Sequence, residues 1–254
     1  MNFLSATSLA GHRILVTGAS SGIGRATAVL LSQCGAQLTL NGRNEDRLAE
    51  TLNQLSGSGH SVAPMALTNA DTVADWLKGL AVAQGPFDGI FHSSGVALIR
   101  PVRLTKQQHL DEVFGSSLMA SFGIPRAAAQ KDVMNPGASI VYMSSVAGSR
   151  GEAGMTAYSA SKAAIDGMVR SFAVELATKR IRVNTIASGA VKTEMVADVS
   201  AKLGDSGMAS YESHHLLGFG QAIDVANAAA FLLSPAAAWI TGTTMAVDGG
   251  YMVR

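Results

Sequence analysis

Short runs of β-branched and apolar residues alternate along this chain with longer stretches that repeat apolar residues every three to four positions. The short runs predict buried strands, and the longer stretches predict amphipathic helices. Such an alternation is typical of βαβ units, which place parallel strands in one sheet with helices on both faces. We therefore expect an α/β fold: a single doubly wound domain over residues 1–254 with a seven-stranded, mostly parallel sheet.

The predicted elements follow one another without a linker rich in Pro, Gly or Ser. The strands are expected at 13–17, 37–41, 61–66, 89–93, 138–143, 182–186 and 243–247. The helices are expected at 22–34, 44–55, 71–83, 105–133, 156–179 and 223–233. The segment 193–220 breaks the alternation because it is long, mixed and rich in Met, Ser, Gly and His, so we expect it to form a mobile lid.

Composition argues against several classes of function. Lys and Arg number 19 against 18 Asp and Glu, which leaves no basic field for nucleic acid. The single cysteine, Cys34, can form neither an internal disulfide nor a thiolate cluster, and the histidines show no ligand spacing, so we expect no metal and a reducing compartment.

Location and assembly follow from the same numbers. No apolar run approaches the roughly 18 to 20 residues that span a bilayer, and the first nine residues lack the basic region of a signal peptide. We therefore expect a cytoplasmic protein with no membrane partner. Only 15% of the residues are charged, which suggests that part of the surface is buried in an oligomer.

A glycine-rich turn joins the first predicted strand to the first predicted helix. Its sequence is Thr17-Gly18-Ala19-Ser20-Ser21-Gly22-Ile23-Gly24. This context predicts a dinucleotide site of the Rossmann type, in which the free N–H groups and the dipole of the helix attract a pyrophosphate. We expect a positive φ at the first glycine, backbone approach to the pyrophosphate at the second and close helix packing at the third. The predicted cofactor-binding residues here are Gly18, Ser20, Ser21, Gly22, Ile23 and Gly24. The alternative is a glycine-rich loop without a ligand.

The end of the second predicted strand normally carries the group that reads the adenosine ribose. Here the sequence is Asn41-Gly42-Arg43-Asn44, with no acidic residue to repel a 2′-phosphate. The Arg43 guanidinium can fork onto phosphate oxygens, so the sequence favours NADP(H) over NAD(H). The alternative is that Arg43 only lies on a solvated face near Glu45 and Asp46.

A phenol and an ammonium group lie one turn apart on the helix expected from Thr156. These are Tyr158 and Lys162, and such a pair alone is weak evidence because chance often produces it. Ser144 and Ser145 end the fifth predicted strand, at the carboxyl edge where open α/β sheets bind ligands. The hydroxyl, phenol and ammonium groups are therefore candidates for one reacting cluster.

Jointly, these motifs resemble the single-domain short-chain dehydrogenase/reductases, especially the 3-oxoacyl-(acyl-carrier-protein) reductase-like branch. The likeness covers nearly the whole chain and rests on the turn at 17–24, on Tyr158-x-x-x-Lys162, on Ser145 thirteen positions before the tyrosine, and on Asp248-Gly249-Gly250. It implies hydride transfer between a nicotinamide and a small carbonyl or alcohol substrate, possibly carrier-bound. It also implies a homotetramer or homodimer, the tetramer being built through the helices at 105–133 and 156–179.

The resemblance gives each member of the cluster a role. Tyr158 would be the general acid/base, Ser145 would hold the carbonyl oxygen, and Lys162 would bind the nicotinamide ribose and lower the pKa of the phenol. A tyrosine pKa of about 10 must fall by roughly 3 units to exchange protons near neutrality, and a nearby lysine supplies about 1 to 3. Further cofactor contacts are implied at Ser94, Gly95, Gly189, Val191 and Thr193, besides Tyr158 and Lys162.

Four positions depart from the family pattern. The usual Asn-Asn-Ala-Gly after the fourth strand is His92-Ser93-Ser94-Gly95, and the asparagine of the family's water-mediated proton relay is replaced by Ser117, which is shorter. After the sixth strand, Ser188-Gly189 takes the place of the family's Pro-Gly pair. The acidic residue that the family pattern places against the adenine is replaced around Ala66. These departures leave open a catalytically relaxed scaffold or dinucleotide sensor.

Overall fold

All seven strands lie in one parallel sheet, in the order β3-β2-β1-β4-β5-β6-β7. The structure is a computed structural model that describes residues 5, 8–194, 196 and 208–253. The strands are β1 (Arg13–Thr17), β2 (Gln37–Asn41), β3 (Ser61–Val62), β4 (Phe87–His92), β5 (Met134–Ser145), β6 (Arg182–Ser188) and β7 (Thr244–Val247). The predicted doubly wound α/β fold is therefore confirmed.

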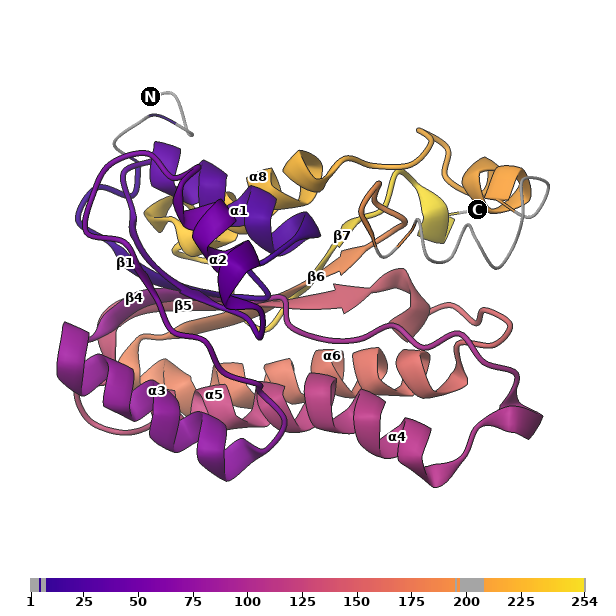
Figure 1. Cartoon of the computed structure of the whole chain (residues 1–254), viewed down its shortest axis with the longest axis horizontal. Coiled ribbons are helices and arrows are strands. Elements are labelled where there is room, and N and C mark those ends of the chain that lie inside the picture. The colour runs from indigo at the N-terminus through magenta and orange to yellow at the C-terminus, as the bar shows by residue number, and fades with distance from the viewer. Residues whose placement is uncertain (1–4, 6–7, 195, 197–207, 254) are drawn as a thin grey trace.

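Helices cover both faces of the sheet (Figure 1). One face carries α1 (Gly22–Gln33), α2 (Glu45–Leu52) and α8 (Ala222–Leu233). The other carries α3 (Ala70–Gln84), α4 (Gln107–Phe114), α5 (Ala120–Ala128) and α6 (Thr156–Leu176). Strand residues alternate between the two layers, so Leu15 packs toward α3, α5 and α6 while Ile14 and Val16 pack toward α1 and α8.

The predicted strands are confirmed, with marked differences in length at two of them. β5 runs over Met134–Ser145 and is longer at both ends than the predicted 138–143. β1 and β2 have the predicted bounds, whereas β3 ends at Val62 and not at Ala66. Pro64 explains the shortening because it has no N–H to donate to the ladder. The N–H groups of Ala63 and Met65, on either side of it, still donate to the carbonyls of Leu40 and Gly42.

The prediction of one continuous helix over 105–133 is wrong. α4 and α5 are separated by a π-helical turn at Gly115–Met119, where the N–H of Ala120 donates to the carbonyl of Gly115, five residues back. Within α5, Pro125 cannot donate to the carbonyl of Ser121. The hydroxyl of Tyr142, on β5, donates to that carbonyl at 3.0 Å instead. The chain has left the helix by Val133, whose carbonyl accepts from Phe87 N.

The predicted lid over 193–220 falls partly outside the described residues, which omit 195 and 197–207. Its described end contains a helical segment at 208–213 and returns to the sheet edge, where Val191 pairs with Gly220. The lid and the extent of the domain stay predictions. Among the described residues, no helix is long and apolar enough to cross a membrane.

Candidate active site

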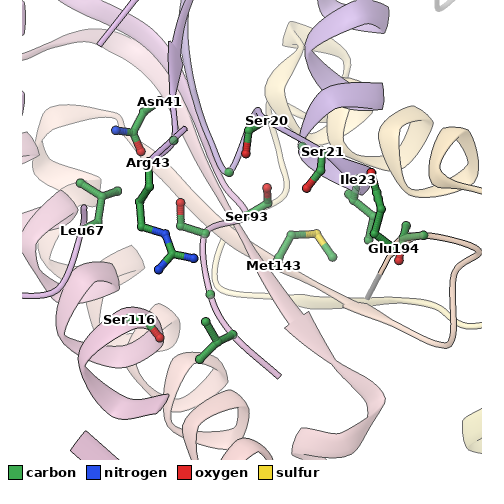
Figure 2. A pocket seen from close by; sticks show the side chains of 18 of the residues that line it. Ser20, Ser21, Ile23, Asn41, Arg43, Leu67, Ser93, Ser116, Met143 and Glu194 are labelled. Carbon is green, nitrogen blue, oxygen red and sulfur yellow. The ribbon is translucent and has the colours of Figure 1, made fainter. Parts of the chain in front are cut away.

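The carboxyl ends of the central strands and the start of α1 surround a cavity of about 280 Å³ (Figure 2). Twelve of the predicted site residues line it: Gly18, Ser20, Ser21, Gly22, Ile23, Gly24, Arg43, Ser94, Gly95, Tyr158, Lys162 and Thr193. The cavity therefore brings the glycine-rich turn and the phenol–ammonium pair to one space, although about 140 residues separate them in the sequence.

The glycine-rich turn has the backbone that its sequence predicts. Gly18 and Gly22 have φ values of +67° and +51°. A Cβ at Gly24 would lie 2.1 Å from the carbonyl oxygen of Gly18, so the close packing expected there occurs within the turn itself. Ser21 precedes α1 without a side-chain capping bond, and the first turn of α1 has no acidic residue. The start of this helix is therefore open to an anion.

Arg43 follows β2 and its side chain extends toward the cavity (Figure 2). It forms no salt bridge with any residue that the structure describes, including Glu45 and Asp46. By contrast, the guanidinium of Arg47 lies 3.4 Å from the carboxylate of Glu194. Arg43 is exposed, as the alternative of a solvated position near Glu45 and Asp46 expects, and it also lines the cavity.

The phenol–ammonium pair lies on α6, beside the end of β5. The Lys162 side chain is buried, its Nζ donates to the carbonyl of Met143 at 2.9 Å, and the same atom lies 5.5 Å from the centre of the Tyr158 ring. The Ser145 hydroxyl accepts from the N–H of Ala147 at 3.2 Å and is hydrogen-bonded to Tyr158. Ser145 does not itself line the cavity, but it adjoins Tyr158 at the cavity wall.

Burial has the largest effect on the pKa values of Tyr158 and Lys162. It raises the pKa of Tyr158, and the hydrogen bond from Ser145 opposes this only in part. It also lowers the pKa of Lys162 to about 8, against the opposing charge of Asp166. The lowering of the phenol pKa that the resemblance implied for Lys162 is therefore not the net effect here.

Besides Ser145, three predicted residues lie outside the cavity lining. Gly189, after β6, packs against His215 and Asp248, because a Cβ there would lie 2.9 Å from His215 Nε2 and 3.0 Å from Asp248. Val191 pairs with Gly220 at the sheet edge. Ser117 lies in the π-helical turn, fully buried behind Gly95, whose Cβ position would be 3.1 Å from the serine Oγ. The cavity is lined by its neighbour Ser116 instead.

Comparisons with known proteins agree with this geometry. The family model described as enoyl-(acyl carrier protein) reductase matches residues 18–252. The chain is 31% identical to 3-oxoacyl-(acyl-carrier-protein) reductase of Vibrio cholerae, over 96% of this chain and 99% of that protein. It is 32% identical to carbonyl reductase family member 4 of Danio rerio, over 93% and 96%. A solved short-chain type dehydrogenase/reductase from Mycobacterium ulcerans superposes with a TM-score of 0.88 at 32% identity, covering 97% of this chain and 91% of that one.

The chain belongs to the short-chain dehydrogenase/reductase family. This membership makes it an oxidoreductase-family protein, whose relatives carry the names of reductases that act on carbonyl groups.

Sequence reasoning missed one wall of the cavity. Met65, Leu67 and Thr68 follow the short β3 and line the end of the cavity nearest to Arg43. Their position at the carboxyl end of the third predicted strand and directly after it was the available signal. Glu194 was also missed, and its Oε2 would lie 3.7 Å from a Cβ at Gly22.

The described end of the predicted lid segment lies near Tyr158. The pKa of Tyr211 is raised to about 12 by burial and by the neighbouring Glu152 and Tyr158. His215 fixes this segment because its Nε2 accepts from the N–H of Ala190 at 3.0 Å and its Nδ1 contacts the carbonyl of Tyr211 at 3.1 Å. The phenol of Tyr211 thus lies near both Glu152 and Tyr158.

Proposed function

We propose that the protein is an NADP(H)-dependent oxidoreductase that interconverts a carbonyl and a secondary alcohol. The observation that carries the proposal is one cavity lined both by the glycine-rich turn and by Tyr158 and Lys162. The turn offers an open helix start and backbone that a side chain would obstruct. These features fit a dinucleotide.

The proposed cofactor contacts are divided between the two ends of the cavity. The turn residues Gly18 to Gly24 would hold the pyrophosphate, and Met65, Leu67 and Thr68 would flank the adenine. Lys162, and Thr193 from its position beside Gly22, would contact the nicotinamide half. Ser94 and Gly95 also line the cavity, and a Cβ at Gly95 would lie 3.8 Å from Nζ of Lys162. When bound, the nicotinamide supplies or accepts the hydride.

The protein's own groups would manage the oxygen and the proton. In reduction, Tyr158 gives its phenolic proton to the oxygen on which negative charge develops. Ser145, already hydrogen-bonded to that phenol, stabilises the same oxygen. The Lys162 ammonium is fixed by the Met143 carbonyl, so its charge acts from a defined position beside the ring.

The proposed preference for NADP(H) rests on Arg43. Its guanidinium is unpaired among the described residues, lines the cavity and stands where an acidic residue would disfavour a 2′-phosphate. NAD(H) is the less favoured cofactor because no carboxylate follows β2 to accept from a free 2′-hydroxyl.

The alternative of a catalytically relaxed scaffold or dinucleotide sensor is not favoured, since Ser145, Tyr158 and Lys162 are all present and adjoin one another. The names of the relatives support a ketone or 3-oxoacyl thioester as substrate, free or carrier-bound.

We propose a homotetramer or homodimer in the cytoplasm. Exposed apolar residues on the two long helical segments, Met119, Phe122 and Val174, support such an assembly. The lone Cys34, which cannot form an internal disulfide, suits a reducing compartment.

The decisive experiment mixes the purified protein with NADPH and a panel of 3-oxoacyl thioesters, diketones, cyclic ketones and quinones while cofactor absorbance is followed. We expect oxidation of NADPH by at least one of them, and slower oxidation of NADH. Tight binding of NADPH without turnover on the whole panel would favour the sensor.

A further inference from the structure

Asp166 is a buried acidic residue to which the proposed mechanism gives no role. It lies on α6 one turn after Lys162, and both side chains are on the face of the helix that packs on the sheet. Only 8% of Asp166 and 5% of Lys162 is exposed. Among the described residues, these two are the only buried carboxylate and the only buried ammonium. The third buried charge, Arg182, donates to the carbonyls of Leu232 and Ser234 beside α8, in the opposite helical layer.

Hydrogen bonds fix the Asp166 carboxylate against β6. The Thr185 hydroxyl lies 2.9 Å from Oδ1 of Asp166 and 2.8 Å from the hydroxyl of Thr244 on β7. Because a carboxylate can only accept, Thr185 donates its one proton to Asp166 and accepts from Thr244. The other carboxylate oxygen, Oδ2, would lie 3.3 Å from a Cβ at Gly148, so a side chain there would crowd it. Arg170 is exposed and donates to the backbone carbonyl of Asp166, not to its carboxylate.

The Lys162 ammonium is anchored on the neighbouring strand, one register step away. Its Nζ donates to the carbonyl of Met143 on β5 at 2.9 Å. In the parallel pairing of β5 and β6, Tyr142 lies opposite Thr185 and Met143 lies opposite Ile186. Backbone positions on adjoining strands that differ by one residue are roughly 6 Å apart. The anchors of the two buried charges are therefore close enough for an appreciable attraction inside a protein.

The other groups packed around Lys162 carry no charge near neutral pH. Burial raises the pKa of the Tyr158 phenol on α6, and the pKa of His92 on β4 is lowered to about 3. The titratable residues of α4 and α5, which also pack on α6, lie at or near the surface: His109, Asp111, Glu112 and Arg126. Lys162 forms no salt bridge with any residue that the structure describes, which leaves Asp166 as the opposite charge buried with it.

We propose that Asp166 is the buried counter-charge of Lys162, and thereby a positioning residue for the reacting cluster. Its carboxylate, held by Thr185, favours the ammonium form of the lysine beside Tyr158. The direction of the lysine pKa agrees, since burial lowers it to about 8 and the charge of Asp166 opposes that lowering. The effect on turnover rests on the proposed function, whereas the coupling of the two charges does not.

The first test is Asp166→Asn, which removes the charge and keeps an oxygen that can accept from Thr185. In the protein without cofactor, carbon-13 NMR of labelled lysine side chains follows the titration of Lys162, whose signal is the one lost in Lys162→Met. We expect the pKa of Lys162 to be about one unit lower in Asp166→Asn than in the parent, the lower end of what a nearby opposite charge supplies. Asp75→Asn, which loses a charge at an exposed position of α3, should leave it unchanged.

Two further variants separate the charge from the hydrogen bond. Thr185→Val removes the bond to Asp166 and leaves the carboxylate, so the pKa of Lys162 should stay within about 0.3 of the parent value even where urea unfolding shows a loss of stability. Asp166→Ser is uncharged and smaller than asparagine, so it should lower the pKa of Lys162 by the same amount. It also replaces Asp166→Asn if that variant does not fold.

Turnover adds a measurement that a purely structural defect would not reproduce. With a substrate that the parent reduces, the alkaline limb of the kcat/KM profile should lie about one pH unit lower in Asp166→Asn. At pH 6, where the ammonium form prevails in both proteins, kcat/KM should stay within about twofold of the parent. A loss of equal size at every pH would overturn the positioning role.

The titrations also have results that contradict the proposal. An unchanged Lys162 pKa in Asp166→Asn, or an equal lowering in Thr185→Val, would overturn the role of the Asp166 charge. If the parent turns over no substrate at all, the proposed function fails, while the NMR titrations still decide whether the two buried charges are coupled.

Discussion

At the scale of single residues, the proposed preference for NADP(H) depends on one side chain. Arg43 is an unpaired cation at the cavity, and Arg43→Asp replaces attraction to a 2′-phosphate by repulsion. We expect the Kd for NADPH to rise by at least about fivefold, roughly 1 kcal/mol, and that for NADH to change little. Fluorescence titration with both cofactors measures this.

The control is Lys78→Asp, which makes the same change of charge at an exposed position of α3 away from the cavity. It should leave both affinities unchanged. If Arg43→Asp also leaves the ratio of the two affinities at the parent value, Arg43 has no part in reading the ribose.

His92 links the same site to stability. Burial, followed by the charge of Lys162, lowers its pKa from 6.5 to about 3, while Tyr142 and Thr17 on the adjoining strands are uncharged. Between these pKa values the unfolded chain binds a proton that the folded protein excludes, so the free energy of unfolding falls as pH falls below 6.5. From pH 7 to pH 5 this loss is about 2 kcal/mol.

His92→Gln removes the titrating group, so its free energy of unfolding should fall by about 2 kcal/mol less over that interval than the parent's. Urea unfolding at pH 7 and pH 5 measures both changes. An identical fall in parent and variant would mean that His92 is protonated in the folded state.

At the scale of elements, α3 and α5 pack closely only because Gly123 has no side chain. A Cβ there would lie 2.6 Å from the Cβ of Val73 and 2.7 Å from the Ala70 carbonyl oxygen. Gly123→Ala should therefore lower the free energy of unfolding by about 2 kcal/mol or more, as measured by urea unfolding. Its matched control is Gly79→Ala, on α3, where nothing lies within 4 Å and the helix should gain about 0.5–1 kcal/mol. Equal effects of the two would refute the packing argument.

The elements also show how far the sequence could predict the fold. Periodicity located β1 and β2 at both ends, because each is a buried run with a turn on either side. It failed over 105–133, where a π-helical turn at Gly115–Met119 divides the segment and the chain has left the helix by Val133. Pro64 could have shortened β3 in the prediction, since its missing N–H is readable from the sequence.

The site was predictable where one motif specifies a local shape. The turn from Gly18 to Gly24 and the spacing of Tyr158 and Lys162 on α6 are local, and the structure brings both to the cavity. The wall formed by Met65, Leu67 and Thr68 was not predicted, because the path of the loop after β3 depends on packing. Gly189 and Val191 were expected at the cofactor but lie outside the cavity lining for the same reason.

At the scale of the whole molecule, the helical layer opposite α1 and α8 exposes apolar side chains. Phe122 is 46% exposed while its ring packs edge-on to Phe172, and Val174 on α6 is 76% exposed. We expect Phe122→Lys with Val174→Lys to convert the parent oligomer to a smaller species, because burying two ammonium groups in an apolar interface is costly. Light scattering coupled to size exclusion measures the mass.

The control for that experiment is Val82→Lys, an equally exposed position on α3. It should leave the parent mass unchanged. A monomeric parent, or a double variant of unchanged mass, would exclude this face as the contact between copies.

The most direct test of the whole account is the Tyr158→Phe variant, which removes one oxygen and leaves the ring that lines the cavity. With a substrate that the parent reduces, we predict that NADPH-linked turnover falls by at least about a hundredfold while the Kd for NADPH stays within threefold. Turnover equal to that of the parent would contradict the assignment of Tyr158 as the proton donor, and with it the mechanism proposed for this cavity.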